Sequence, residues 1–252
     1  MTALQNIIEI AREAGTAILR TKKKLTVSKK SDGSHLTNAD MASHTLIIER
    51  LAKITHDPII SEESGSTHVP TTSSFWLVDP LDGTRGFITG SNEYSVNIAL
   101  ITNHAPVLAV IYLPELEHTY WATVGGGTYR DDTNIFNSSN RKNLIGVTSR
   151  TENNQEVTFL HDRGIKEIRH HGSALKFCML AEGGVDIYPR FHRCKEWDTA
   201  AGHLLAKEAG CDMLDCKTGQ EPRYGKPGFI NNSFIVFNRE SDYIGRGYGD
   251  SS

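Results

Sequence analysis

The chain has 252 residues, of which 38% are hydrophobic and 23% charged, and its formal net charge is −3 with histidine neutral. This length fits one large domain or two small ones, and the nearly balanced charge argues against a surface for nucleic-acid polymers. No apolar run approaches the ~20 residues of a membrane span, and the first residues lack the pattern of an export signal. We therefore expect a globular, cytoplasmic protein; peripheral membrane association and the oligomeric state stay open.

Two helices are expected near the beginning of the chain. Apolar side chains recur at spacings of three and four over residues 4–19, with Thr2 as a candidate N-cap. A second amphipathic stretch covers residues 38–54, and either Thr37 or its neighbour Asn38 is suited to cap it. Both patterns predict helices that cover a core on one side.

The stretch from Phe75 to Thr84 is the most informative part of the sequence. Residues 75–78 are aromatic or branched and fit a buried strand, which we expect to end at Asp79-Pro80 because proline cannot donate to a strand ladder. Asp82-Gly83 then predicts a turn. Two carboxylates three residues apart would thus lie at the carboxyl end of a strand, where function gathers in many α/β folds.

Further strands and turns are expected around this stretch. The candidate strands are 58–60, 93–102, 106–113 and 117–123, followed by a tight reversal at Gly125–Gly127 and a polar loop over 131–143. The pattern then changes to alternating strands and helices: a strand at 144–149, a helix at 173–182 opened by Ser173, a helix from Glu196 to about 209 stopped by Gly210, and a strand at 233–237.

This change of pattern predicts a division into two parts. We expect an N-terminal α+β domain over 1–142 that carries most of the candidate metal ligands, and a C-terminal α/β domain over 143–238. The remaining residues, 239–252, are rich in glycine, serine and charge, which predicts a disordered tail.

Four carboxylates share one local setting, since each follows a strand or begins a helix: Glu62, Asp79, Asp82 and Asp198. If they converge, they repel one another unless cations neutralise them. Oxygen ligands of this kind suit Mg²⁺, and two such ions ~3.5–4 Å apart can support hydrolysis of a phosphate ester. A buried strand with an Asp-rich turn remains the plain structural alternative.

Other signatures of phosphate or acyl chemistry are absent from the sequence. The glycine-rich run after Asp82 lacks a following Gly-Lys-Ser/Thr, so it is no P-loop, and no Gly-x-Ser-x-Gly elbow occurs. The three glycines at 125–127 do not open a helix, which argues against a dinucleotide-binding fingerprint. The four cysteines are scattered without zinc spacing and fit free thiols: Cys178, Cys194, Cys211 and Cys216.

Three motifs resemble those of the inositol monophosphatase superfamily, the lithium-sensitive, magnesium-dependent phosphomonoesterases. They are Glu62-Glu63, Asp79-Pro80-Leu81-Asp82-Gly83-Thr84 and Trp197-Asp198-Thr199-Ala200-Ala201-Gly202, in the family's order and at its separations. The resemblance runs from about residue 4 to 238 and implies a layered αβαβα sandwich. The stretches 93–101, 172–178 and 188–191 are most similar to the bacterial 3′(2′),5′-bisphosphate nucleotidases. This implies hydrolysis of adenosine 3′,5′-bisphosphate, with 3′-phosphoadenylyl sulfate as a second substrate.

The resemblance also implies a metal-ligand set. Glu62, Asp79 and the Leu81 carbonyl would hold one Mg²⁺ ion, and Asp79 would bridge to a second ion held by Asp82 and Asp198. Glu62 would also help to position a weaker third ion near the nucleophile, so two or three ions are expected. The same groups would border the bound substrate phosphate.

Roles for the remaining site residues follow from the same motifs. Thr84, hydrogen-bonded to Asp40, would orient the attacking water and help to deprotonate it. Backbone amides of Gly83 and Thr84 would hold the scissile phosphate. The candidates for the other phosphate and the ribose are Ser173, Lys176 and Arg190.

Two departures from the nucleotidase pattern leave the substrate less defined. Gly86 stands where these enzymes usually carry an acidic residue, and Leu36 stands where a proline usually precedes the threonine of Thr37-Asn38-Ala39-Asp40. Two alternatives therefore stay open: an activity like that of inositol monophosphatase or fructose-1,6-bisphosphatase, and a non-catalytic protein that binds nucleotide or metal.

Overall fold

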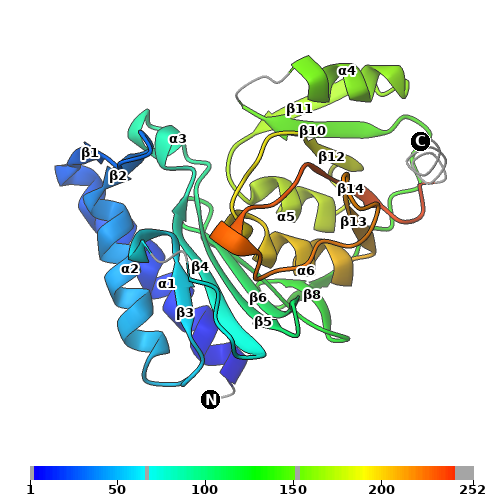
Figure 1. Cartoon of the computed structure of the whole chain (residues 1–252). Helices are drawn as coiled ribbons and strands as arrows, with labels where there is room; N and C mark the ends of the chain where they lie inside the picture. Colours follow the sequence, from blue (N-terminus) through cyan, green and yellow to red (C-terminus); the bar gives the residue numbers. More distant parts are fainter. Residues whose placement is uncertain (1–2, 66–67, 151–153, 242–252) are drawn as a thin grey trace.

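The structure is a computed structural model that describes residues 3–65, 68–150 and 154–241 (Figure 1). Two of its three β-sheets, with seven and five strands, are separated and flanked by helices, and the third is a two-stranded hairpin. α1 (Ala3–Thr21) and α2 (Asn38–Leu51) cover the outer face of the larger sheet, α5 (Leu175–Ala181) and α6 (Ala200–Glu208) lie between the sheets, and α4 (Asn154–Asp162) covers the smaller one. Three clusters of buried apolar side chains fill the contacts between layers. The expected αβαβα layering is confirmed.

The larger sheet has seven strands in the order β3-β4-β5-β6-β7-β8-β9, and only its first pair is parallel. The strands are β3 (Ile59–Ser61), β4 (Ser74–Asp82), β5 (Ser95–Thr102), β6 (Ala105–Leu113), β7 (His118–Thr123), β8 (Gly127–Arg130) and β9 (Thr133–Ile135). The strands expected at 93–102, 106–113 and 117–123 are confirmed. The expected loop over 131–143 is wrong in part, because β9 pairs with β8 there.

The expected end of the strand at Asp79-Pro80 is also wrong, because β4 continues to Asp82. β3 pairs with β4 only as far as Val78, so the next residues need no ladder donor on that side. On the other side the pairing with β5 shifts register between Asp79 and Asp82, and Pro80 lies in this irregularity. The buried Ser43 hydroxyl on α2 donates to the Pro80 carbonyl at 2.7 Å.

The smaller sheet has five strands in the order β11-β10-β12-β14-β13. They are β11 (Glu167–His171), β10 (Ile145–Ser149), β12 (Ile187–Arg190), β14 (Phe234–Asn238) and β13 (Cys211–Asp215). The strands expected at 144–149 and 233–237 are confirmed, whereas the sequence patterns did not predict the other three. The helix expected from Glu196 divides into η3 (Glu196–Asp198) and α6, and Gly210 follows with φ +93°.

The expected helix caps have mixed outcomes. Thr37 caps α2, since its hydroxyl accepts from the amides of Ala39 and Asp40, and the helix ends at Leu51 rather than at 54. Ser173 does not cap α5: it has φ +48°, and the cap position belongs to Ala174. The proposed cap Thr2 and most of the expected tail lie outside the described residues.

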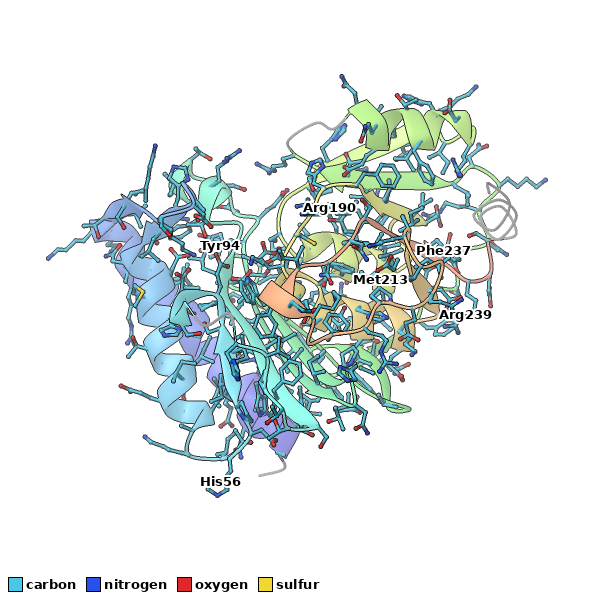
Figure 2. The ribbon with its side chains drawn as sticks, in the orientation of Figure 1. His56, Tyr94, Arg190, Met213, Phe237 and Arg239 are labelled. Atoms are coloured by element: carbon cyan, nitrogen blue, oxygen red, sulfur yellow. The ribbon has the colours of Figure 1, made fainter. Side chains whose placement is uncertain are left out.

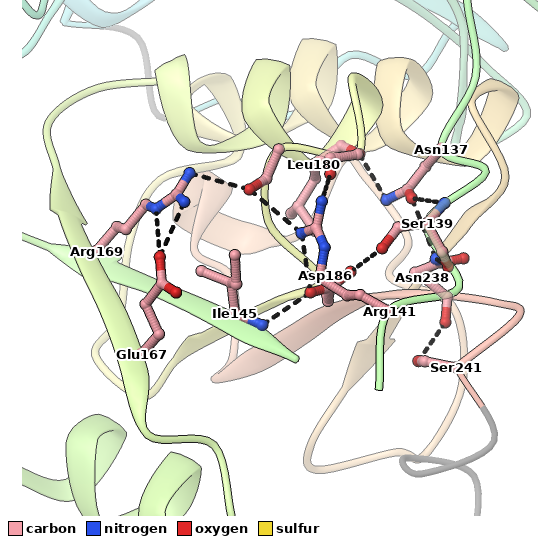
Figure 3. Close-up of polar contacts among 12 residues, drawn as sticks. Asn137, Ser139, Arg141, Ile145, Glu167, Arg169, Leu180, Asp186, Asn238 and Ser241 are labelled. Carbon is pink, nitrogen blue, oxygen red and sulfur yellow. Dashed lines mark hydrogen bonds and ion pairs between the residues drawn. The ribbon is translucent and has the colours of Figure 1, made fainter. Parts of the chain in front are cut away.

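The segment that joins the two sheets is held by buried polar groups (Figure 3). The Asp186 carboxylate accepts from the Ser139 hydroxyl at 2.6 Å, from the Ile145 amide at 2.7 Å and from Arg141 at 3.1 Å. The Asn137 side chain donates to the Leu180 carbonyl at 2.7 Å. These bonds tie the connection to β12 and α5, the elements that carry Arg190 and Lys176.

Candidate metal and phosphate site

Three predicted carboxylate ligands meet where the two sheets approach each other. Ligand oxygens of Glu62, Asp79 and Asp198 all lie within 4.8 Å of one another. Glu62 begins the short 3-10 turn η2 (Glu62–Ser64) directly after β3, and the parallel register of β3 with β4 brings it beside Asp79. Asp198 comes from the C-terminal part of the chain, and its carboxylate accepts from the Lys195 amide at 2.9 Å. Residues 136 positions apart in the sequence thus share one site.

The carboxylates of this cluster destabilise one another's charged forms. Burial, followed by repulsion from Glu62 and Asp82, raises the pKa of Asp79 well above its ordinary value. Burial and the nearby Asp82 raise the pKa of Asp198 to about 8, and burial raises the pKa of Asp82 as well. A site of buried, mutually repelling oxygen ligands is suited to a hard divalent cation.

Two further observations concern the charge and the unpaired polar atoms around the carboxylates. Lys30, which follows the strand β1 (Val27–Lys29) of a small hairpin with β2 (His35–Thr37), donates to Glu62 at 2.6 Å and to Glu63 at 2.7 Å. An ammonium group thus already compensates part of the negative charge. The hydroxyl of Ser95, which is fully buried and in register with Asp82, has no hydrogen-bond partner among the described residues. The carboxylate oxygens that meet here are the kind of ligand that Mg²⁺ prefers, so the residues present fit this ion.

Thr84 and Asp40 are hydrogen-bonded, as expected. The Thr84 hydroxyl lies 3.0 Å from Asp40 Oδ1 and equally far from the Leu81 carbonyl oxygen. The other carboxylate oxygen of Asp40 accepts from the Thr37 amide at 2.8 Å and from its hydroxyl at 2.5 Å. The same carboxylate therefore completes the capping box of α2 and faces the candidate site.

Gly83 connects β4 to the five-residue helix α3 (Thr84–Ile88) in a conformation that favours glycine. Its φ is +94°, and a Cβ atom there would lie 3.0 Å from the Glu93 carbonyl oxygen. The first amides of a helix have no partner within it. The backbone after Asp82 is thus arranged so that amides of Gly83 and Thr84 can serve an anion.

A cleft of about 460 Å³ adjoins the carboxylates and has the size of a small-molecule site. Its lining includes Asp82, Gly83, Ser173, Lys176, Arg190 and Asp198. Figure 2 labels Arg190 on the C-terminal part and Tyr94, next to the lining residue Glu93, on the N-terminal part. The cleft therefore lies between the two parts of the chain.

The three predicted substrate contacts all belong to this cleft. Lys176 is 4% exposed, donates to the carbonyls of His171 and Ser173, and has its pKa lowered to about 8 by burial. Arg190 donates to the Ser149 hydroxyl at 2.5 Å, and its buried Nε has no hydrogen-bond partner among the described residues. Cationic groups thus line the same cleft as Asp82 and Asp198.

The structure adds residues to the site that the sequence patterns did not single out. Lys30 pairs with the glutamates, and Arg85, Glu93 and Arg150 line the cleft. Glu93 begins one of the stretches on which the resemblance rests, which was a usable signal. The other three are single basic residues in polar loops or a short helix, and only the fold brings them to the site.

The profile of the Inositol monophosphatase family matches residues 2–242, and the chain belongs to this family. The 3′(2′),5′-bisphosphate nucleotidase CysQ of Salmonella typhimurium is 37% identical over 243 residues, which cover 92% of this chain and 98% of the relative. The crystal structure of CysQ from Bacteroides thetaiotaomicron, a bacterial member of the family, is 34% identical, has a TM-score of 0.81 and covers 94% and 97% of the two chains. The IMPase TM1415 of Thermotoga maritima is 27% identical, with a TM-score of 0.80 and coverage of 95% and 93%.

The family match and the acidic cluster agree that this chain is a member of the Inositol monophosphatase family. The family match spans residues 2–242, the range in which the acidic cluster and the residues that line the cleft lie. Within the described residues, no helix is both long enough and apolar enough to cross a membrane.

Proposed function

We propose that this chain is a magnesium-dependent 3′(2′),5′-bisphosphate nucleotidase, which hydrolyses adenosine 3′,5′-bisphosphate to AMP and phosphate. The observation that carries the proposal is the convergence of three carboxylates, Glu62, Asp79 and Asp198, beside a cleft that is lined by Asp198 and also by the cations Lys176 and Arg190. Acidic ligands suit the metal, and the cations suit a second phosphate on the same substrate. Similarity to CysQ over 92% of the chain supports this choice within the family. 3′-Phosphoadenylyl sulfate is the second expected substrate.

The metal ligands are those that the motifs imply. Glu62, Asp79 and the Leu81 carbonyl would hold one ion, and Asp79, Asp82 and Asp198 would hold a second; Glu62 would help to position a weaker third. Bound Mg²⁺ supplies charge neutralisation and lowers the pKa of water. The raised pKa values of Asp79 and Asp198 mean that both carboxylates must lose protons before they bind a cation.

The chain's own residues orient the attacking water. Thr84 donates its hydroxyl proton to Asp40 at 3.0 Å, so a lone pair of Thr84 Oγ1 is directed to accept from water. Asp40 is fixed from behind by Thr37, which keeps its free lone pairs oriented toward Thr84. As the water attacks phosphorus and the bond from phosphorus to the 3′ oxygen breaks, the proton of the water passes through Thr84 to Asp40. The leaving 3′ oxygen takes up a proton from solvent and becomes the 3′ hydroxyl of AMP, and Asp40 returns its proton to solvent.

The substrate lies across the cleft. Amides of Gly83 and Thr84 hold the reacting phosphate, and Ser173, Lys176 and Arg190 contact the ribose and the second phosphate. Lys176 already donates to two carbonyl groups, which orients its ammonium. Arg190 lines the same cleft, and its Nη1 is oriented by its bond to the Ser149 hydroxyl.

A substrate panel tests the proposal. Phosphate release is measured side by side from adenosine 3′,5′-bisphosphate, inositol 1-phosphate and fructose 1,6-bisphosphate, with Mg²⁺ and with a chelator. We expect the highest kcat/KM for the nucleotide and no release in the chelator. A higher value for inositol 1-phosphate would assign the chain to the inositol phosphatases, an alternative supported by the Thermotoga maritima IMPase. If none of the three esters is hydrolysed, the chain is a non-catalytic protein that binds nucleotide or metal.

A further inference from the structure

Arg150 lies at the mouth of the cleft and is held there by Glu93. Arg150 lines the cleft directly after β10, and its Nε donates to Glu93 Oε2 at 2.8 Å. The Arg150 side chain is 52% exposed, whereas that of Glu93 is 17% exposed. The guanidinium is therefore fixed at one nitrogen beside an open cavity.

Glu93 is itself anchored by the C-terminal part of the chain. Besides Arg150, its carboxylate accepts from the Gly172 amide at 2.6 Å and from His171 Nδ1 at 3.0 Å. Burial alone would raise the pKa of Glu93, but these three donors lower it to about 2. Glu93 is thus a rigid, charged acceptor.

The backbone of Glu93 also lies against the predicted phosphate loop. A Cβ atom on Gly83 would lie 3.0 Å from the Glu93 carbonyl oxygen, and one on Gly172 would lie 3.2 Å from the same atom. Glu93 therefore sets the position of Arg150 relative to the backbone that faces the reacting phosphate.

Two of the three other cations that line the cleft, Lys176 and Arg190, are already engaged in part, whereas Arg85 makes no side-chain hydrogen bond among the described residues that would fix its direction. Lys176 donates to two carbonyl groups, and Arg190 Nη1 donates to Ser149. Arg150 uses its Nε for Glu93, and within the described residues its two terminal nitrogens have no other hydrogen bond, so the planar fork can meet an anion with paired hydrogen bonds.

We infer that Arg150 binds the non-reacting anionic group of the substrate, and that Glu93 is its positioning residue. This inference rests on the proposed nucleotidase function. It assigns the preference for a bisphosphate over a monoester to an arginine that neither the metal motifs nor the predicted substrate contacts include. A half-exposed ion pair contributes little to the free energy of unfolding. The Arg150–Glu93 pair is therefore better explained by the orientation that it gives the guanidinium than by a contribution to stability.

The direct test compares two substrates that differ in one phosphate. We measure kcat/KM for adenosine 3′,5′-bisphosphate and for adenosine 3′-monophosphate in the parent and in Arg150→Ala. The ratio of the two values should fall about tenfold, which corresponds to about 1.4 kcal/mol. The loss should appear in KM for the bisphosphate. Inhibition by AMP should weaken to a similar extent, whereas inhibition by inorganic phosphate should not change.

Glu93→Gln separates positioning from a simple effect of charge. Removing a negative charge from the cleft would by itself lower KM for a polyanion. If Glu93 positions Arg150, KM for the bisphosphate should instead rise several-fold. Arg150→Lys keeps the charge but loses the fork, and it should recover only part of the ratio.

A matched pair outside the cleft serves as the control. Arg130 on β8 donates to Glu182, after α5, at 2.8 Å, with side chains 41% and 28% exposed. Arg130→Ala and Glu182→Gln make the same charge changes and remove a similar ion pair, and they should leave the ratio unchanged.

The outcomes distinguish the inference from the function on which it rests. If the parent does not prefer the bisphosphate, the proposed function itself fails. If the parent prefers it and Arg150→Ala keeps the ratio, or the control variants lower it equally, the assignment of Arg150 is wrong. A lower KM in Glu93→Gln would refute the positioning role.

Discussion

The hydroxyl of Thr84 donates to Asp40 across 3.0 Å, and this bond joins the first turn of α2 to the residue that follows Gly83. Because Thr37 holds the other oxygen of Asp40, the pair cannot rotate freely. A proton acceptor is thereby fixed beside the end of β4, before any ligand is present.

Removal of the Thr84 hydroxyl, which links the attacking water to Asp40, should lower kcat more than it changes KM. We expect Thr84→Val to lower kcat by about 10²–10⁴-fold, the range of general acid–base catalysis, with a small change in KM. Thr84→Ser keeps the hydroxyl and should retain most of the activity. Steady-state kinetics at saturating Mg²⁺ measures both. Equal losses in the two variants would show that the methyl group, rather than the hydroxyl, matters.

Asp79→Asn should abolish activity and leave the fold intact. This carboxylate is the buried one of the three convergent ligands, and an amide cannot replace its charge toward a cation. Calorimetric titration with Mg²⁺ should show the loss of binding directly. Thermal unfolding without metal should show equal or higher stability, because the variant removes a charge that Glu62 and Asp198 repel. Activity equal to that of the parent would contradict the metal site.

The stability of the metal-free protein should fall as the pH rises from about 4 toward 8. The pKa of Asp198 is raised to about 8 in the folded protein, above the ordinary value of 3.8, so the folded state binds more protons than the unfolded state in this interval. Stability then decreases with pH until the folded-state carboxylate has ionised. Denaturant unfolding of parent and Asp198→Asn in a chelator measures this, and the slope should be smaller in the variant. Identical slopes would mean that Asp198 is not the cause.

Ser43 should contribute to metal affinity through the backbone of β4. Its hydroxyl donates to the Pro80 carbonyl in the irregular part of the strand between Asp79 and Asp82. Ser43→Ala should cost about 1 kcal/mol of unfolding free energy and weaken Mg²⁺ binding several-fold. Thr128→Val removes an equally buried bond of 2.7 Å to the Leu205 carbonyl and serves as the control. We expect a similar loss of stability from it without any change in calorimetric Mg²⁺ affinity.

The strands that the sequence patterns missed are mostly those at sheet edges. β9 closes one end of the larger sheet, and β11 and β13 are the two edges of the smaller one. Edge strands are short and face solvent on one side, so they need no continuous apolar run. The helix over 4–19 was predictable because apolar residues at spacings of three and four over so long a stretch are typical of an amphipathic helix and of few other structures.

The sequence by itself determined the acidic motifs, several of the helices and strands with buried faces, and the resemblance to a phosphatase family. These follow from local spacing, because a buried strand, a cap or a glycine turn needs particular residue types close together. Only the tertiary structure decided that Asp198 meets Glu62 and Asp79, that β4 continues through Pro80, and that Glu93 holds Arg150 at the cleft. These contacts join residues from 57 to 136 positions apart or depend on which strand lies alongside, and such pairings are set by packing of whole layers rather than by neighbouring residues.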